Sequence, residues 1–153
     1  MTPLRLFRLA ALAEAVTWTL LIAGLVLRAT AGLGIAVTIG GGVHGFVFLA
    51  FAVIAVLVAI NQRWSFGVTA LAVGSAVVPY ATIPLELWLA RSGRLIGSWR
   101  LETTSDPRDG RWFDRAARAL FRRPIVLVLI VAVGVIAVFT TLLILGPPGG
   151  ASA

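Results

Sequence analysis

LAALAEAVTWTLLIAGLVL, residues 9–27, is a run of 19 residues that a single ionisable side chain, Glu14, interrupts. A helix over this run is about 28 Å long, close to the roughly 30 Å thickness of a bilayer hydrocarbon core. Thr2 and Pro3 are suited to an N-cap and a first helical residue, so the helix is expected to begin there. A cleaved signal peptide is the alternative, but its apolar region is shorter, about 7–15 residues. The run predicts a membrane-spanning helix over about 5–28.

The composition also indicates a membrane protein. Of the 153 residues, 59% are hydrophobic and 12% are charged, whereas a soluble domain carries about 25% charged residues. Three more apolar runs cover about 33–60, 66–90 and 125–145, and Pro79 and Pro84 predict a kink in the second of these. We therefore expect an all-α integral membrane helical bundle with four transmembrane helices, a three-helix module in residues 1–91 plus one.

One long hydrophilic segment, residues 92–124, separates the last two runs, and residues 91–124 contain nine of the thirteen arginines. Residues 111–123 place apolar and charged side chains on opposite sides at helical spacing, which predicts an amphipathic helix on the cytoplasmic membrane surface. A solvated helix packed on its own loop is the alternative. The expected lipid-surface residues are Arg111, Trp112, Arg115, Arg118, Arg122 and Arg123. Gly and Pro dominate the start of residues 146–153, which are expected to form a disordered tail.

The net charge of +7 arises entirely from arginine, because the chain has no lysine. Four spans would put three arginines on one side of the membrane and ten on the other, and an excess of arginine marks the cytoplasmic side. Both termini are therefore expected outside the cell inner (plasma) membrane, with the 91–124 loop inside. Anionic lipids are the expected partners of this loop, and nucleic acid is not expected because no stacking platform or known binding module is visible.

Ionisable side chains inside spans are costly and need partners. Counted from the cytoplasmic ends, Glu14 and His44 lie at similar depths, about 21 and 16 Å, while Glu86 lies only about 8 Å deep. We expect Glu86 to pair with a charge near the inner surface, from Arg28, Arg91 or Arg94. The predicted intramembrane polar site comprises Glu14, Thr17, Trp18, His44, Ser75, Thr82 and Glu86.

The Glu14–His44 pair has three interpretations. It can lock two helices together, it can transfer a proton or bind a ligand, or His44 can bind a metal or haem. The last is weakest, because the chain has one His and no Cys. No catalytic residues, metal site or cofactor are predicted, and an enzyme is not expected. Close helix packing is expected at Gly41 and Gly45 of a small-residue pair, and at Pro79.

A resemblance to a known family rests on four segments, which are Phe7-Arg8 through Glu14-Ala15-Val16-Thr17-Trp18, Gly41-x-x-His44-Gly45-x-x-Phe48, Trp64-Ser65, and Pro79-Tyr80-Ala81-Thr82 with Glu86. These resemble bacterial integral membrane proteins known as domain of unknown function 3817, over roughly residues 4–91. The resemblance implies a three-helix membrane module and marks Glu14, His44, Pro79 and Glu86 as motif positions. It implies no reaction. Arg28 stands where the family suggests lysine, and the loop and fourth helix lie outside the resemblance.

The sequence thus predicts a multi-pass inner-membrane protein that acts as an interaction or accessory module, assembling with itself or with a larger membrane complex. Four helices are few for an autonomous transporter. The alternative is a small oligomeric transporter or proton-coupled channel that uses Glu14 and His44.

Overall fold

A computed structural model describes residues 1–146, and every regular element in this range is a helix. The helices are, in chain order, α1 (Pro3–Ala31), α2 (Gly34–Gln62), α3 (Phe66–Gly74), η1 (Ser75–Val77), α4 (Thr82–Arg91), η2 (Pro107–Gly110), α5 (Trp112–Phe121) and α6 (Pro124–Leu145). This confirms the all-α fold class for the described residues. The predicted tail lies, from residue 147 onward, outside them.

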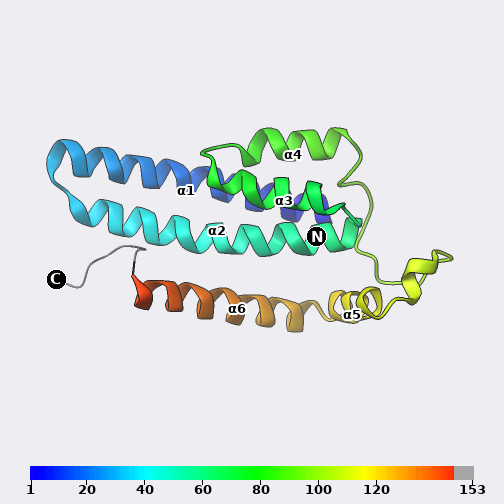
Figure 1. Ribbon diagram of the computed structural model, residues 1–153. Coiled ribbons are helices and arrows are strands. Elements are labelled where there is room, and N and C mark those ends of the chain that lie inside the picture. The colour runs from blue at the N-terminus through cyan, green and yellow to red at the C-terminus, as the bar shows by residue number, and fades with distance from the viewer. Residues whose placement is uncertain (147–153) are drawn as a thin grey trace.

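The two longest helices, α1 and α2, form an antiparallel pair, and the loop that carries η2 extends beyond one end of this pair (Figure 1). The Thr2 hydroxyl caps α1 by accepting the Arg5 N–H (3.3 Å), and Gly32 ends it with a φ of 69°. The largest buried apolar side chains gather at the end of the pair away from this Gly32 turn. There Phe7 contacts Phe51 and Trp64, with ring centroids 5.5 and 5.8 Å apart.

The close contact between α1 and α2 is made by two glycines that the sequence pattern did not single out. A Cβ atom at Gly24 would lie 2.7 Å from the backbone oxygen of Ala36, and one at Gly40 would lie 2.8 Å from that of Leu20. Neither backbone can accept a side chain without the helices moving apart. The predicted pair, Gly41 and Gly45, does not make this close backbone contact with α1. A Cβ at Gly41 would meet one atom of Leu21 at 3.8 Å, and Gly45 faces Phe139 of α6.

The predicted single kinked helix over 66–90 is wrong. The chain reverses between α3 and α4, which lie side by side along one half of α1 and α2 (Figure 1). The two ends of this hairpin meet, because the Trp64 Nε1–H donates a hydrogen bond to the Arg94 carbonyl (2.8 Å). Its tip lies beside the middle of α1, where Thr19 Oγ1 and the Tyr80 hydroxyl are 3.2 Å apart.

Both prolines fit a chain reversal better than a kink. Pro79 and Tyr80 are the central residues of a turn closed by the Ala81 N–H and the Val78 carbonyl (3.1 Å). Tyr80 has a φ of 63°, the positive value that the residue after proline takes in a type II turn. Pro84 lies in the first turn of α4, where the helix needs no N–H donor from it. Each arm of about ten residues covers only about half of a bilayer.

Three helices in the described residues, α1, α2 and α6, are long and apolar enough to cross a membrane. The four-span count therefore loses the 66–90 segment. The position of the N-terminus also differs from the expected one. The Trp99 Nε1–H donates a hydrogen bond to the Met1 carbonyl (2.9 Å). Met1 and the 91–124 loop thus lie at the same end of the molecule, which does not fit the expectation that the membrane separates them. From this end α6 runs towards the turn between α1 and α2, so the last turn of α6 lies far from the N-terminus (Figure 1).

Candidate functional site

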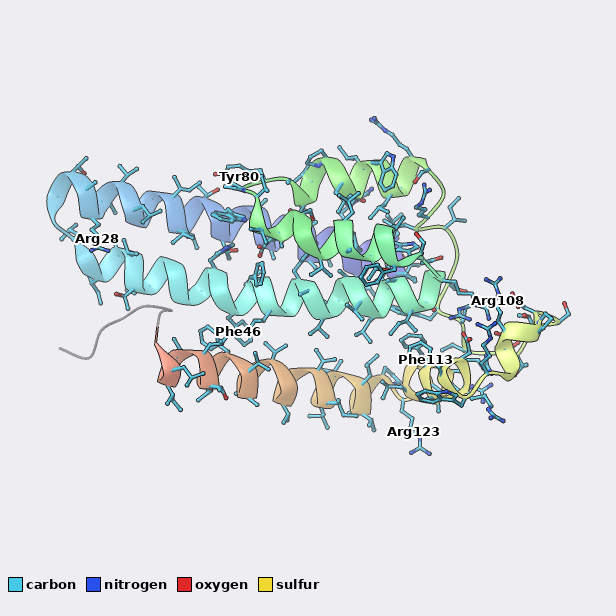
Figure 2. The ribbon with its side chains drawn as sticks, in the orientation of Figure 1. Arg28, Phe46, Tyr80, Arg108, Phe113 and Arg123 are labelled. Carbon is cyan, nitrogen blue, oxygen red and sulfur yellow. The ribbon has the colours of Figure 1, made fainter. Side chains whose placement is uncertain are left out.

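Polar contacts fix the α3–α4 hairpin to α1. Glu86, buried on α4, pairs with Arg8 at 2.9 Å, and Thr82 donates to the Ala11 carbonyl at 3.2 Å. Glu86 therefore pairs with an arginine near the N-terminus, and the expected pairing with Arg28, Arg91 or Arg94 is wrong. Figure 2 shows the reason for Arg28, which lies at the opposite end of the molecule from Arg108 and the loop.

The other residues predicted around Glu86 have separate contacts. Arg94 lies over the Trp88 ring, 4.7 Å from its centroid. Ser75 donates to the Ala72 carbonyl within its own helical segment, at 2.7 Å. These residues, with Thr82 and Glu86, belong to the hairpin and its attachment, not to the group around Glu14.

Four residues from α1 and α2 meet in the middle of the bundle. His44 Nδ1 is 3.2 Å from Thr17 Oγ1 and 3.9 Å from Glu14 Oε1. The Trp18 ring lies against the His44 ring, with centroids 4.3 Å apart, and its Nε1–H donates to the Ala76 carbonyl of η1 (3.1 Å). Glu14, Thr17 and Trp18 lie on one face of α1 because they are three and four residues apart.

Thr17 connects the two helices. Its hydroxyl is within hydrogen-bond distance of the Glu14 carbonyl (3.0 Å) and of His44 Nδ1 (3.2 Å), and the tautomer of the ring decides which atom donates in the second contact. Trp18 and Thr17 together hold the imidazole in one orientation.

The Glu14 carboxyl group is unusual in this setting. The residue is 0% exposed, and neither oxygen has a hydrogen-bond partner among residues 1–146. At 3.9 Å the contact with His44 is too long for a hydrogen bond. A buried polar group without a partner costs about 1–3 kcal/mol. The described residues provide no cluster of three His, Cys, Asp or Glu for a metal ion.

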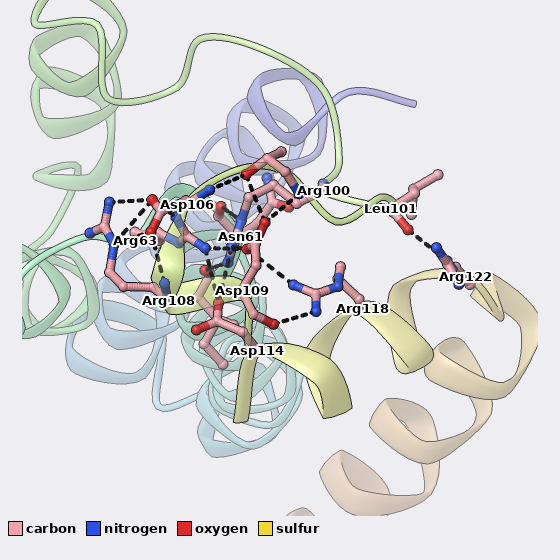
Figure 3. A network of polar contacts seen from close by, with 12 residues as sticks. Asn61, Arg63, Arg100, Leu101, Asp106, Arg108, Asp109, Asp114, Arg118 and Arg122 are labelled. Carbon is pink, nitrogen blue, oxygen red and sulfur yellow. Dashed lines mark hydrogen bonds and ion pairs between the residues drawn. The ribbon is translucent and has the colours of Figure 1, made fainter. Parts of the chain in front are cut away.

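A second polar cluster, at the loop end, was missed by the sequence analysis. Its centre is Asp109, 3% exposed, whose Oδ1 accepts from Arg63 and from Arg118 (3.0 Å). Oδ2 of Asp109 accepts the backbone N–H and the hydroxyl of Thr104, both at 2.7 Å. Arg63 also bonds to Asp106. Figure 3 shows these side chains converging from α2, the loop and α5, and we call the group of Arg63, Arg100, Thr104, Asp106, Asp109, Asp114 and Arg118 the loop clamp.

Arg100 connects the loop clamp to the end of α2. Its side chain donates to the carbonyls of Ile60 (2.7 Å) and Asn61 (2.6 Å) in the last turn of the helix, where carbonyl groups are left without an N–H donor four residues later in the helix. It also donates to Asp114 at 3.0 Å. The Asn61 side chain returns the contact by accepting the Arg100 backbone N–H (2.8 Å). The loop is thus folded onto the bundle.

The predicted helix over 111–123 is present as α5, but its arginines differ in environment. Arg118 is 7% exposed and belongs to the loop clamp, so the structure contradicts its assignment to the lipid surface. Arg122 donates to the Leu101 carbonyl (2.6 Å). Arg111, Arg115 and Trp112 are exposed, and so is Arg123 at the start of α6.

Ion pairing in the loop clamp changes the acidity of its carboxyl groups. Hydrogen bonds from the Arg108 side chain and backbone hold the pKa of Asp106 well below its usual value, with the charge of Arg63 adding to the effect. Hydrogen bonds from Thr104 lower the pKa of Asp109, helped by Arg63 and Arg118. Both carboxyl groups therefore stabilise the folded loop in their ionised form.

The loop clamp is expected to hold at neutral pH and to open in acid. A carboxyl group with a depressed folded pKa stabilises the fold above its unfolded pKa, about 3.9, and this stability is lost as pH falls below that value. Hydrogen exchange over residues 100–118, corrected for the intrinsic rate at each pH, should show protection disappearing below about pH 4 while α1 and α2 stay protected. Asp109→Asn should lose this protection at neutral pH. Glu102→Gln, at an exposed acid, is the control, and acid-resistant protection would contradict the assignment.

Comparison with known proteins identifies relatives of part of the chain. The family described as "Domain of unknown function (DUF3817)" matches residues 4–91, which contain Glu14, His44 and the hairpin. A protein of Streptomyces coelicolor named "Putative membrane protein SCO5905" is 41% identical over 108 residues, or 68% of this chain. The match spans only 12% of that relative's length. No solved structure gives a significant match.

Proposed function

The chain belongs to the DUF3817 family of membrane proteins, and we propose that it is a cytoplasmic-membrane protein that serves as an assembly module. The module would join a second copy of itself or another membrane protein. One observation carries the proposal. α6 is a 22-residue apolar helix, yet Val135 is its only buried residue within the described range, at 5% exposure.

Two further observations support the assembly role. α6 packs loosely on α2, with a groove of about 530 Å³ left between them beside Phe46 and Phe139. The matched segment of the Streptomyces coelicolor relative is a small part of a much longer protein, which is typical of a module joined to other domains. A helix added beyond the family region is suited to contact a partner that the 4–91 core does not reach.

Cysteine scanning of α6 tests the assembly role, because the natural chain has no cysteine. Single cysteines at Leu129, Ile130, Val133 and Ile136, all exposed, are expected to form a disulfide-linked dimer or a crosslink to one partner on one face of the helix. Val135→Cys is the matched control, because this position is buried against the rest of the chain. A chain that stays monomeric and uncrosslinked at all four positions would contradict the proposal.

The distribution of arginine supports a different orientation from the one first expected. With the hairpin returning to its starting side, twelve of the thirteen arginines lie at the end that holds Met1 and the loop, and Arg28 alone lies at the other. Arginine excess favours the cytoplasm. We infer that the N-terminus and the 91–124 loop are cytoplasmic and that α6 ends outside.

Reporter fusions distinguish the two orientations. A reporter that works only in the cytoplasm should be active when joined before Met1 or after Glu102, and inactive when joined after Thr30 or Leu145. The Thr30 fusion is the internal control, since the turn between α1 and α2 is at the same end as Leu145 (Figure 1). Cytoplasmic activity of the Leu145 fusion would contradict this orientation, because it would place the arginine-rich end outside the cytoplasm.

A second candidate function is proton transfer through the Glu14–His44 pair. It is favoured by the buried Glu14 carboxyl group, whose oxygens lack partners within the described part of the chain. The fold alone gives no reason to keep such a group.

A further inference from the structure

A cavity of about 310 Å³ lies where the end of α2 meets α3, the loop and α5. Its polar wall includes Arg63, Arg108 and Arg111, together with Thr69 and Asp114, and its apolar wall includes Val56, Ile60 and Phe113. The Asp114 carboxylate is already paired with Arg100 (3.0 Å) and Arg63 (3.6 Å). The cavity therefore has two chemically different sides. One offers guanidinium groups and the other offers aliphatic and aromatic surface.

The three arginines differ in how far their charge is already satisfied. Arg108 is paired with Asp106 (2.7 Å), and Arg63 with Asp106 and Asp109. The Nε–H of Arg63 is buried and lacks a hydrogen-bond partner among residues 1–146. The Arg111 side chain is exposed and forms no hydrogen bond or ion pair within the same range. The cavity thus holds one unpaired cation, Arg111.

The surroundings of the cavity add positive charge. In residues 91–124 nine arginines face four acidic residues, a net charge of +5. Guanidinium groups bind phosphate through paired, charged hydrogen bonds. An anion that enters this cavity would therefore be favoured both by direct contacts with Arg111 and by the field of the whole loop.

The place of the cavity in the molecule points to a lipid. Val56 and Ile60 lie on the last turns of α2, one of the helices long and apolar enough to span a membrane, and Trp64 follows directly. Tryptophan is enriched at membrane interfaces. The arginine side would then meet the headgroup layer, and the apolar side would continue into the hydrocarbon. Basic pockets beside membrane helices bind acidic headgroups in this way.

We propose that this cavity binds one anionic glycerophospholipid, with its phosphate at Arg111, Arg63 and Arg108 and its upper acyl chain against Val56, Ile60 and Phe113. The site shares Arg111 with the general lipid surface that the sequence suggested, but its other lining residues lie outside that surface. It depends on the loop end lying at the membrane surface. It does not depend on assembly through α6, so its failure would leave that proposal untouched.

The test uses the full chain purified in detergent, with phosphatidylglycerol or phosphatidylcholine added and bound lipid counted by native mass spectrometry. The wild type should retain one phosphatidylglycerol with a preference of about tenfold over phosphatidylcholine. Arg111→Gln should remove most of this preference. Arg115→Gln removes the same charge from an exposed residue of α5 that does not line the cavity. This variant should keep the preference for phosphatidylglycerol.

Two further arms keep the test decisive. Val56→Phe should lower phosphatidylglycerol retention by filling the apolar wall, without touching any arginine. Arg111→Gln and Val56→Phe should both keep the hydrogen-exchange protection of residues 100–118, because neither Arg111 nor Val56 belongs to the loop clamp. Equal losses in Arg111→Gln and Arg115→Gln would overturn the proposal by showing a general charge effect. Displacement of the lipid by about 10 mM inorganic phosphate would assign the site to free phosphate instead.

Discussion

Gly40→Ala is expected to lower the free energy of unfolding by about 1–3 kcal/mol, the usual cost of overpacking a tight contact. The added Cβ would lie 2.8 Å from the Leu20 backbone oxygen and 3.2 Å from the Leu21 Cα. Neither atom belongs to a flexible side chain, so the two longest helices must move apart. This separation would also loosen the neighbouring contact at Gly24, which faces the Ala36 backbone in the same way.

Gly41→Ala and Gly42→Ala are the matched controls, because each adds the same methyl group to the same helix. A Cβ at Gly41 would make an ordinary contact with Leu21, and one at Gly42 would meet nothing within 4 Å. Both changes should be neutral or stabilising by up to about 1 kcal/mol, since alanine is the better helix former. Unfolding in mixed micelles of increasing denaturing detergent measures all three variants. Equal effects at Gly40 and Gly41 would show that α1 and α2 are not held together where the structure has them.

These glycines show what the spacing of small residues can predict and what it cannot. The sequence offers a cluster of six glycines between residues 32 and 45, and a small-residue pair four apart is a common helix-packing signal. Several such pairs exist in this cluster. Only the rotation of α2 against α1 decides that Gly40 faces the partner helix while Gly41 does not. The presence of a close helix contact could be predicted, but its residues could not.

The prediction of a single helix over the third apolar run, residues 66–90, was wrong for a related reason. A run of about 25 apolar residues has the length of one span or of two half-length arms, and proline is compatible with both. The distinguishing feature is Pro79 followed by Tyr80, which is a turn with a positive φ in the structure. Tyrosine is a rare residue at that position, so local preference alone argues against the reversal. Contacts with α1, at Arg8, Ala11 and Trp18, hold the hairpin in place.

Membrane depth estimated from residue counts predicted the right neighbour for residues on helices that share a turn, and the wrong neighbour for a residue on a helix that does not. Glu14 and His44 were counted along two helices joined by one short connection, and the structure has their side chains 3.9 Å apart. Glu86 was counted from an end assumed to lie beside Arg28, but the reversal takes it to Arg8. The loop clamp was out of reach for another reason. Its acids find arginines as far as 46 residues away, in an arrangement that only the complete chain path defines.

Glu14→Leu is expected to stabilise the protein and to abolish any proton transfer through the bundle. Replacing a buried carboxyl group that has no partner by an apolar side chain of similar size removes a cost of about 1–3 kcal/mol. A purely structural Glu14–His44 contact predicts the opposite, a loss of stability. Unfolding in mixed micelles gives the first measurement. The second is proton influx into liposomes that contain the protein, followed by a pH-sensitive dye under an imposed membrane potential.

Glu14→Gln separates charge from shape, because the amide keeps the size of the carboxyl group but cannot bind or release a proton. Under the proton-transfer proposal its influx should fall to that of empty liposomes, and His44→Phe should do the same. Glu102→Gln, which makes the same chemical change at an exposed residue of the loop, should leave influx at the wild-type rate. Wild-type influx in Glu14→Gln together with lowered stability in Glu14→Leu would assign the pair to helix packing alone. Raised stability with lost influx would instead explain why the bundle keeps a carboxyl group that its own packing does not need.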